Sequence, residues 1–225
     1  MRYTNLLNPN EYIVYRDALG NKPVYYYSDD KQIIISDSIK DILRKGIKVE
    51  VDIDALNEYF TFQNIYSDRT LFKGIKMLPA GHSSQYINGK LEIHKYYDIP
   101  TNQVEMKEGE WEKLIEKKLT QSVDRLVEEG DGSFLSGGLD SASVAYLASQ
   151  RTKLKTFTMG FDLTTAKGIE QTFDERVAAE EMSRLIGSEH YEMVLHSGDM
   201  HSIMPELIYH LEDLRVGMSL SLIHI

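Results

Sequence analysis

Short apolar runs alternate with polar turns in the N-terminal part of the chain, which is the pattern of a β-rich region. The runs EYIVY, PVYYY and QIIIS are rich in β-branched and aromatic residues, and the turn-like segments RDALGNK and SDDK separate them. We expect hairpins from this spacing. The stretch HSSQYINGKLEIHKYY places Asn88-Gly89 between two alternating runs, which is a strong hairpin signal.

Two segments in this region have the spacing of short helices. They are SIKDILRK and DIDALNEYFTF, and the second offers Asp52 or Asp54 as its N-cap residue. The tyrosines from Tyr25 to Tyr27 alternate between the two faces of a predicted strand. This alternation favours packing in the core and across strands over a stacking platform for a ligand.

The polar segment DIPTNQVEMKEGE separates the β-rich region from one with helical periodicity. We place a linker at residues 99–109, so that residues 1–98 form a first domain and residues 110–219 a second. The second domain is predicted to begin with a helix that ends before Gly130. Its apolar face consists of Trp111, Leu114, Ile115, Leu119, Val123, Leu126 and Val127.

Strand and helix patterns then alternate three times. The strands are SFL, LKTFTMGF and EHYEMVL, and the helices are SASVAYLASQ, DERVAAEEMSRLI, which Gly187 closes, and DMHSIMPELIYHLE. This order predicts βαβ units, and hence an α/β fold with a parallel sheet and right-handed crossovers. Ligands of such sheets bind outside the carboxyl ends of the strands. The turn LSGGLDS lies at one of these ends.

This turn combines backbone and side-chain donors at the start of a helix. The N–H groups at a helix N-terminus favour an anion, and Ser136 and Ser141 add hydroxyl donors for phosphate oxygens. The carboxylate of Asp140 would repel a bare phosphate but would bind a Mg²⁺ ion that bridges it to a polyphosphate. The strand before and the helix after favour this function over a plain Gly-Gly turn whose serine or aspartate only caps the helix. Neither G-x-x-x-x-G-K-[ST] nor G-x-G-x-x-G occurs in the sequence.

Composition limits the classes of function. The formal net charge of −10 is spread along the 225 residues and no basic run occurs, which argues against nucleic acid as a partner. No signal peptide and no run of about 18 apolar residues is present, so we expect a soluble cytoplasmic protein without membrane contact. The chain has no cysteine, which excludes disulfides, thiolate zinc sites and a cysteine nucleophile in this chain.

For two further groups of polar residues, we expect neither a metal site nor a catalytic role. His190, His196 and His201 share no helical face and form no H-E-x-x-H motif, so surface or hairpin-end positions are favoured over a zinc site. The acidic segment DERVAAEE suits the start of a helix, where negative charge complements the macrodipole. We expect a solvated face there rather than paired catalytic carboxylates.

The turn and its neighbours resemble a known family. LSGGLDS is similar to the pyrophosphate-binding loop of the ATP pyrophosphatase (PP-loop) superfamily, whose members adenylate a carboxylate or carbonyl oxygen. Within this superfamily, further segments of the chain resemble the asparagine synthetase family and occur in the family's order over most of residues 12–217. They are YRDALGNKPVYYY, RTLFKGIKMLPAGH, YYDIP, TFTMGFD and FDERVAAEEMSRLIGSEHYE. The resemblance implies a parallel-sheet, adenine nucleotide alpha-hydrolase-like domain, preceded by the last part of a β-rich N-terminal-nucleophile-type glutaminase domain.

The resemblance also implies roles for residues in and near the turn. It assigns phosphate contacts to Ser136, Gly137, Gly138 and Ser141, Mg²⁺ coordination to Asp140, and contacts with the nucleoside to Leu135 and Met159. The implied substrates are aspartate, ATP, and glutamine or ammonia, and a homodimer is left open. An aspartate carboxylate would attack the α-phosphorus of ATP, giving an aspartyl-adenylate and pyrophosphate, and ammonia would then attack the acyl group. This chemistry needs charge neutralisation and positioning more than a protein nucleophile.

The sequence departs from the family towards both ends. The family's glutaminase uses an N-terminal cysteine, whereas the second residue here is Arg2, and Thr4 is no substitute because such a nucleophile must be terminal. The family's second Gly-rich turn and its phosphate-directed lysine do not follow HLEDLRVGMS. We therefore expect an incomplete synthetase with little turnover and a foreign tail at residues 220–225. Two alternatives stay open, a related amide- or ring-forming ligase and a non-catalytic nucleotide-binding module.

Overall fold

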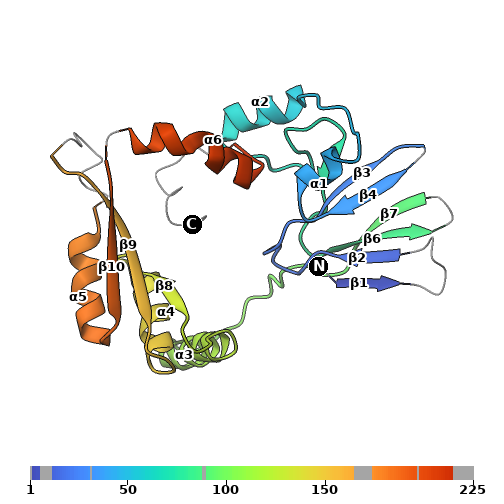
Figure 1. Cartoon of the computed structure of the whole chain (residues 1–225). Helices are drawn as coiled ribbons and strands as arrows, with labels where there is room; N and C mark the ends of the chain where they lie inside the picture. The colour runs from blue at the N-terminus through green and yellow to red at the C-terminus, as the bar shows by residue number, and fades with distance from the viewer. Residues whose placement is uncertain are drawn as a thin grey trace. The chain divides into compact units, whose positions relative to one another are not determined.

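The computed structural model describes residues 2–5, 12–30, 32–87, 90–164, 174–196 and 198–214 (Figure 1). The chain divides into two units. The first contains the residues up to Asn102 together with residues 207–214, and the second runs from Gln103 to Glu206. The domain bounds expected from the sequence stay a prediction, and the expected tail at residues 220–225 lies outside the described residues.

Two small antiparallel sheets form the body of the first unit. One consists of β1 (Arg2–Asn5), β2 (Tyr12–Tyr15), β6 (His82–Ile87) and β7 (Lys90–Lys95). The other consists of β3 (Tyr25–Ser28), β4 (Ile33–Ser36) and β5 (Ile75–Met77). The strand orders are β1-β2-β6-β7 and β4-β3-β5, and every neighbouring pair is antiparallel.

The expected hairpins form in part. β3 pairs with β4, and β6 pairs with β7 on either side of the Asn88-Gly89 turn, whose own residues lie outside the described part. The hairpin expected across RDALGNK is wrong, because β2 pairs with β1 and β6 instead of β3. The Arg16 guanidinium explains this course, since it donates to the carbonyl oxygens of Gly20 at 3.0 Å and Leu78 at 2.7 Å. These bonds tie the turn to the chain that follows β5.

Two short helices complete the first unit at the predicted positions. They are α1 (Ile39–Leu43) and α2 (Ile53–Phe62). Asp52 is the N-cap residue of α2, because its carboxylate accepts the N–H of Ala55 at 3.0 Å. This confirms one of the two N-cap candidates in the sequence.

The tyrosines of β3 pack into two separate clusters, as the alternation of a strand requires. Tyr26 is buried with Val14, Val24 and Leu78. Tyr25 and Tyr27 pack on the other side, against a cluster of Ile39, Ile42, Ile47 and Ile75. The expected packing role of the tyrosine run is therefore confirmed.

Helices and strands alternate through the second unit. They are α3 (Glu108–Asp124), β8 (Gly132–Phe134), α4 (Leu139–Ser149), β9 (Lys155–Phe161), α5 (Arg176–Ile186) and β10 (Glu189–Leu195). The last helix, α6 (Asp199–Leu211), begins in this unit, and its residues from Leu207 belong to the first unit. The strand order is β10-β9-β8, and β9 runs parallel to both neighbours. Gly187, with a φ of 71°, ends α5 as predicted. The chain thus has a mixed α/β architecture with small sheets.

The core of the second unit joins the sheet to α3, α4 and α5. Its buried members are Val123, Leu135, Ala145, Ala148, Leu154 and Ala179. The predicted apolar face of α3 is buried only in part, since Trp111, Ile115 and Leu126 are exposed. Val123 and Val127 are its residues in this cluster, so the core is contacted only by the C-terminal end of α3 and the turn after it.

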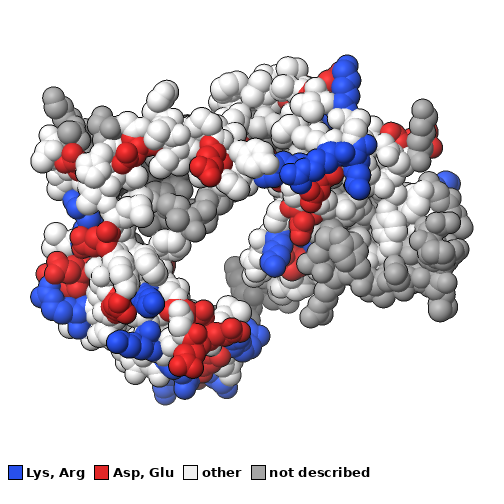
Figure 2. All heavy atoms as spheres, viewed as in Figure 1, with Lys and Arg blue, Asp and Glu red and all other residues white. Residues whose placement is uncertain are grey.

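The charged surface shows no separation by sign on the face that Figure 2 displays. Acidic and basic side chains lie interspersed there, and the described residues of this face form no continuous basic stripe. None of the described helices is both long and apolar enough to cross a membrane.

Candidate functional site

The loop Leu135–Ser141 leaves the carboxyl end of β8 and enters α4. Leu135 is fully buried, and its N–H donates to the carbonyl oxygen of Phe157 at 2.9 Å. The Thr158 hydroxyl in β9 donates to the carbonyl oxygen of Leu135. These two bonds extend the pairing of β8 with β9 by one residue. The first residue of the loop is therefore fixed to the sheet.

Two serine hydroxyls close the loop on itself. The Oγ atoms of Ser136 and Ser141 are 2.8 Å apart, and Ser141 Oγ accepts the N–H of Ser136 at 3.1 Å. The same oxygen lies 3.2 Å from the carbonyl oxygens of Ser136 and Gly138, to either of which it can donate. Ser136 Oγ accepts the N–H of Gly138 at 3.2 Å. Two residues expected to contact phosphates are thus brought together.

The two glycines of the loop have no side chains that could cover its backbone. A Cβ atom on Gly137 would lie 2.3 Å from the Cβ atom of Ala178 in α5, so no larger residue fits there without movement. Gly138 is the N-cap residue of α4 and supplies no side-chain acceptor. Among the described residues no acceptor is bonded to the N–H groups of Leu139, Asp140 and Ser141. The start of α4 therefore offers free donors to an anion.

The three other expected site residues have different surroundings. The side chain of Asp140 is exposed in the first turn of α4. Met159 is half-buried in β9, opposite Met193 of β10. Leu135 packs in the core with Ala145 and Ala148. Its assigned contact with a nucleoside, like that of Met159, stays a prediction.

Asp174 and Arg176 lie at the start of α5, the helix that contacts this loop at Gly137, and the sequence pattern predicted no ion pair between them. The segment DERVAAEE was expected to be a solvated helix start, and for Asp174 this is wrong. Its side chain is only 8% exposed, and its carboxylate binds Arg176 with distances of 2.5–3.0 Å. The Arg176 guanidinium, as the main cause, holds the pKa of Asp174 below its ordinary value of 3.8, although burial opposes this. The pair Asp-x-Arg at the start of an apolar helix was the available signal.

His190 has a different environment from the one expected. His190 was expected at the surface, but it lies inside β10 with a side chain only 11% exposed. Its Nδ1 atom lies 2.9 Å from the hydroxyl of Thr156, which also contacts Ser188 at 2.8 Å. Within the described part of the chain, no group of three or more His, Asp or Glu side chains could hold a metal ion.

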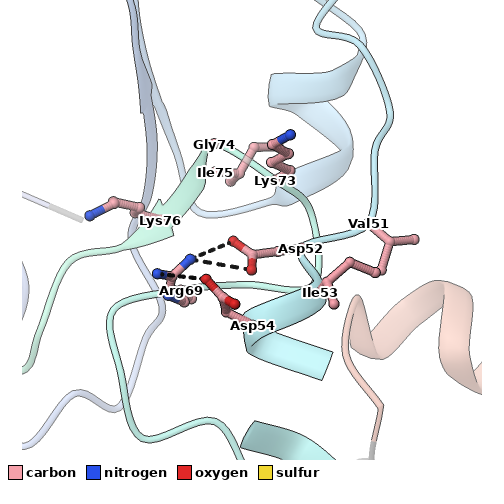
Figure 3. A pocket seen from close by; sticks show the side chains of 9 residues that line it. All are labelled: Val51, Asp52, Ile53, Asp54, Arg69, Lys73, Gly74, Ile75 and Lys76. Carbon is pink, nitrogen blue, oxygen red and sulfur yellow. Dashed lines mark hydrogen bonds and ion pairs between the residues drawn. The ribbon is translucent and has the colours of Figure 1, made fainter. Parts of the chain in front are cut away.

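The first unit contains a cavity of about 330 Å³, lined by residues of the loop before α2 and by the chain around β5 (Figure 3). Arg69 projects into it and binds Asp52 at 3.0 Å and Asp54 at 3.2 Å. The other two basic side chains of its wall, Lys73 and Lys76, pair with Glu50 and Asp68. None of the residues expected to bind a nucleotide lines this cavity.

Comparisons with known proteins match most of the sequence. A family model for asparagine synthase matches residues 114–224, and a model for a glutamine amidotransferase domain matches residues 7–97. Asparagine synthetase (glutamine-hydrolyzing) 1 of Bacillus subtilis is 28% identical over 214 residues, which are 92% of this chain and 32% of that protein. Asparagine synthetase (glutamine-hydrolyzing) 3 of the same organism is 26% identical over 206 residues, which are 86% and 34%.

A fungal protein of another name is also similar. Amidase chry2 of Gibberella zeae is 29% identical over 195 residues, which are 77% of this chain and 27% of that protein. The chain spans about a third of the length of the curated relatives it matches. The asparagine synthase model covers the loop between β8 and α4, the amidotransferase model covers the first unit up to residue 97, and the chain belongs to the asparagine synthetase family.

Proposed function

We propose that the protein to which this chain belongs converts aspartate to asparagine with ATP, and that the loop Ser136–Ser141 binds the ATP phosphates. One observation carries the proposal: two serine hydroxyls, two glycines and N–H groups that bond no acceptor in the described part of the chain converge at the carboxyl end of a parallel strand. The asparagine synthetase relatives support aspartate and glutamine as the other substrates. A cytoplasmic location belongs to the same proposal, and a homodimer stays a prediction.

The donors of the loop suit a polyphosphate. The N–H groups of Leu139 to Ser141 and the positive end of the α4 dipole favour an anion, and the two hydroxyls can turn from each other towards phosphate oxygens. The carboxylate of Asp140 is an oxygen ligand of the kind that Mg²⁺ prefers, and its exposure leaves it free for an ion shared with the phosphates. Mg²⁺ held there would neutralise part of the phosphate charge.

The proposed reaction has two steps. A carboxylate oxygen of aspartate forms a bond to the α-phosphorus of ATP, and the bond from that phosphorus to pyrophosphate breaks. Ammonia then forms the amide bond, AMP leaves, and the nitrogen loses a proton. The loop would contribute by holding the pyrophosphate portion in line with the attacking oxygen. Because this chain has no cysteine, a cysteine nucleophile for glutamine hydrolysis would have to lie outside these residues.

A second candidate keeps the adenylation and changes the acceptor. The similarity to Amidase chry2, a relative that is not called an asparagine synthetase, leaves room for another acceptor. A third candidate is a module that binds the nucleotide without turnover. All three candidate functions use the same loop to bind ATP, so they differ only in the steps after ATP binding.

Two measurements separate these candidates. Titration calorimetry of the full chain with Mg-ATP should detect binding that Ser136→Ala and Asp140→Ala weaken by about tenfold each, while the matched control Ser149→Ala at the other end of α4 binds as the wild type does. Absence of wild-type binding would contradict the assignment of the loop in this chain. ATP–pyrophosphate exchange by the complete gene product, with aspartate and other carboxylates compared, then identifies the acceptor. Exchange specific to another acid would refute aspartate, and binding without exchange would favour the non-catalytic module.

A further inference from the structure

Asp174 and Arg176 form a compact pair at the start of α5, which we call the Asp174–Arg176 clip. Arg176 Nε lies 2.9 and 3.0 Å from the two carboxylate oxygens of Asp174, and Nη2 lies 2.5 Å from Oδ2. The backbone N–H of Arg176 also donates to this carboxylate, at 3.1 Å. The Asp174 and Arg176 side chains are 8% and 21% exposed. The clip is therefore a largely buried ion pair with several hydrogen bonds, unlike a surface pair.

The clip holds the end of β9 at Phe161. Arg176 Nη2 donates to the carbonyl oxygen of Phe161 at 3.1 Å, and the backbone N–H of Phe161 contributes to the lowered pKa of Asp174. The side chain of Arg176 lies on Gly160, where a Cβ atom would be 2.3 Å from Nε and 2.6 Å from Cδ. Gly160 thus leaves the space that the arginine occupies. The first residue of α5 is fixed to the last residues of β9.

The first turn of α5 also contacts the loop Ser136–Ser141. Ala178 follows Arg176 by two residues, and its Cβ atom occupies the space where a side chain of Gly137 would lie. Ala179 is fully buried in the same cluster as Leu135, the first residue of the loop. The backbone of the loop therefore rests against α5, and the position of α5 is set by the clip.

We infer that the Asp174–Arg176 clip is a positioning device for the nucleotide, acting through α5 on the loop Ser136–Ser141. The inference rests on the proposed function, because the position of the loop affects a nucleotide only if the loop binds one. The contacts that join the clip, α5 and the loop do not depend on any ligand. Gly138 gives α4 no side-chain cap, and the hydrogen bonds within the loop come from Ser136 and Ser141 alone. Contact with α5 is what restrains Gly137. Asp174 and Arg176 are positioning residues that act on the nucleotide only through the loop.

The test compares loop mobility and nucleotide affinity in variants of the full chain. Asp174→Asn and Arg176→Met break the clip, Arg176→Lys keeps the charge but not the planar fork, and Glu180→Gln breaks an exposed pair with Arg184 in the same helix. We expect faster amide hydrogen exchange at Ser136 and Gly138 and about tenfold weaker Mg-ATP binding in the first two variants. Arg176→Lys should be intermediate, and Glu180→Gln should match the wild type.

The outcomes separate this inference from the proposed function. If Asp174→Asn lowers the thermal midpoint but leaves loop exchange and Mg-ATP affinity unchanged, the clip only stabilises α5 and the inference is overturned. If the wild-type chain binds no Mg-ATP, the proposed function of the loop fails, and exchange at Ser136 and Gly138 still decides whether the clip positions the loop. Faster loop exchange in Asp174→Asn, with an intermediate rate in Arg176→Lys, supports the inference in either case.

Discussion

Gly137 and Ala178 face each other so closely that a Cβ atom on the glycine would lie 2.3 Å from the Cβ atom of the alanine. Real Cβ atoms do not approach to this distance. The loop Ser136–Ser141 therefore requires glycine at position 137 because of a neighbouring helix, independently of any ligand.

Gly137→Ala should destabilise the second unit by about 1–3 kcal/mol, because either the loop or α5 must move. Mg-ATP affinity should fall as well. The double variant Gly137→Ala, Ala178→Gly should recover part of that affinity, since it removes the clashing methyl group. Gly109→Ala in α3 is the matched control, because a Cβ atom there meets nothing within 4 Å. Unfolding in urea and calorimetry measure both effects, and equal losses in the single and double variants would contradict the contact.

Ser141→Ala should loosen the loop, because Ser141 Oγ bonds both the N–H and the hydroxyl of Ser136. We expect a loss of about 1–2 kcal/mol in the free energy of unfolding and faster exchange of the Ser136 amide. Ser149 serves as the control, since its hydroxyl bonds only neighbours at the exposed end of α4: it donates to the carbonyl oxygen of Tyr146 and accepts the side-chain amide of Gln150 at 3.4 Å. Ser149→Ala should change stability by less than about 0.5 kcal/mol. Equal effects of the two substitutions would show that the Ser141 hydroxyl does not stabilise the loop more than the Ser149 hydroxyl stabilises the end of α4.

The second unit should lose stability in acid partly through Asp174. Its pKa in the folded chain is below the ordinary value of 3.8, mainly because of Arg176, so its contribution is present above that value and is lost as the pH falls through the folded pKa. Asp174→Asn should therefore be less stable than the wild type by about 1–3 kcal/mol at neutral pH, and the gap should shrink below about pH 4. Trp111, the single tryptophan, lies in α3 of the same unit and can report unfolding by fluorescence. A gap independent of pH would show that the lost packing, not the charge, matters.

Glu212 should stabilise α1, although the two lie far apart in the sequence. Its carboxylate accepts the hydroxyl of Ser38 at 2.7 Å and the N–H groups of Ile39 and Lys40 at 2.8 and 2.9 Å, with its side chain only 9% exposed. Glu212→Ala leaves these donors without their charged acceptor and should cost about 2–3 kcal/mol. Amide exchange at Ile39 and Lys40 measures the effect.

Helix α1 itself contains a control for the Glu212 variant. Asp41 pairs with Arg44 at 2.6 Å, and both side chains are exposed. Asp41→Asn should change the stability of the first unit by less than about 1 kcal/mol, as is usual for surface pairs. If Glu212→Ala has no larger effect than Asp41→Asn, the contact with α1 contributes nothing.

Local patterns predicted the elements that carry the site. The change from period two to period 3.6 located α3, the alternation of strand and helix patterns located α4 and α5, and the glycine at position 187 marked the end of α5. Residue type limited the N-cap of α2 to Asp52 or Asp54, and the structure identifies Asp52. Such signals are readable because each depends on a few consecutive residues.

Contacts between distant residues could not be predicted in this way. The pairing of β2 with β6 depends on which strand lies next to it in space, and RDALGNK has the composition of a hairpin turn in either case. Asp174 has the same neighbours in sequence whether it is solvated or bound to Arg176. The place of the loop between β8 and α4 could thus be predicted, while the contacts of the loop with α5 required the structure.

The backbone passes between the two units once after Asn102 and again within α6, so the described part of the first unit consists of two separate stretches of sequence. Recombination between relatives at the linker alone would join α1 of one parent to Glu212 of the other. A chimera that keeps the first unit intact needs a second breakpoint near Glu206, so that residues 207–214 are inherited together with α1.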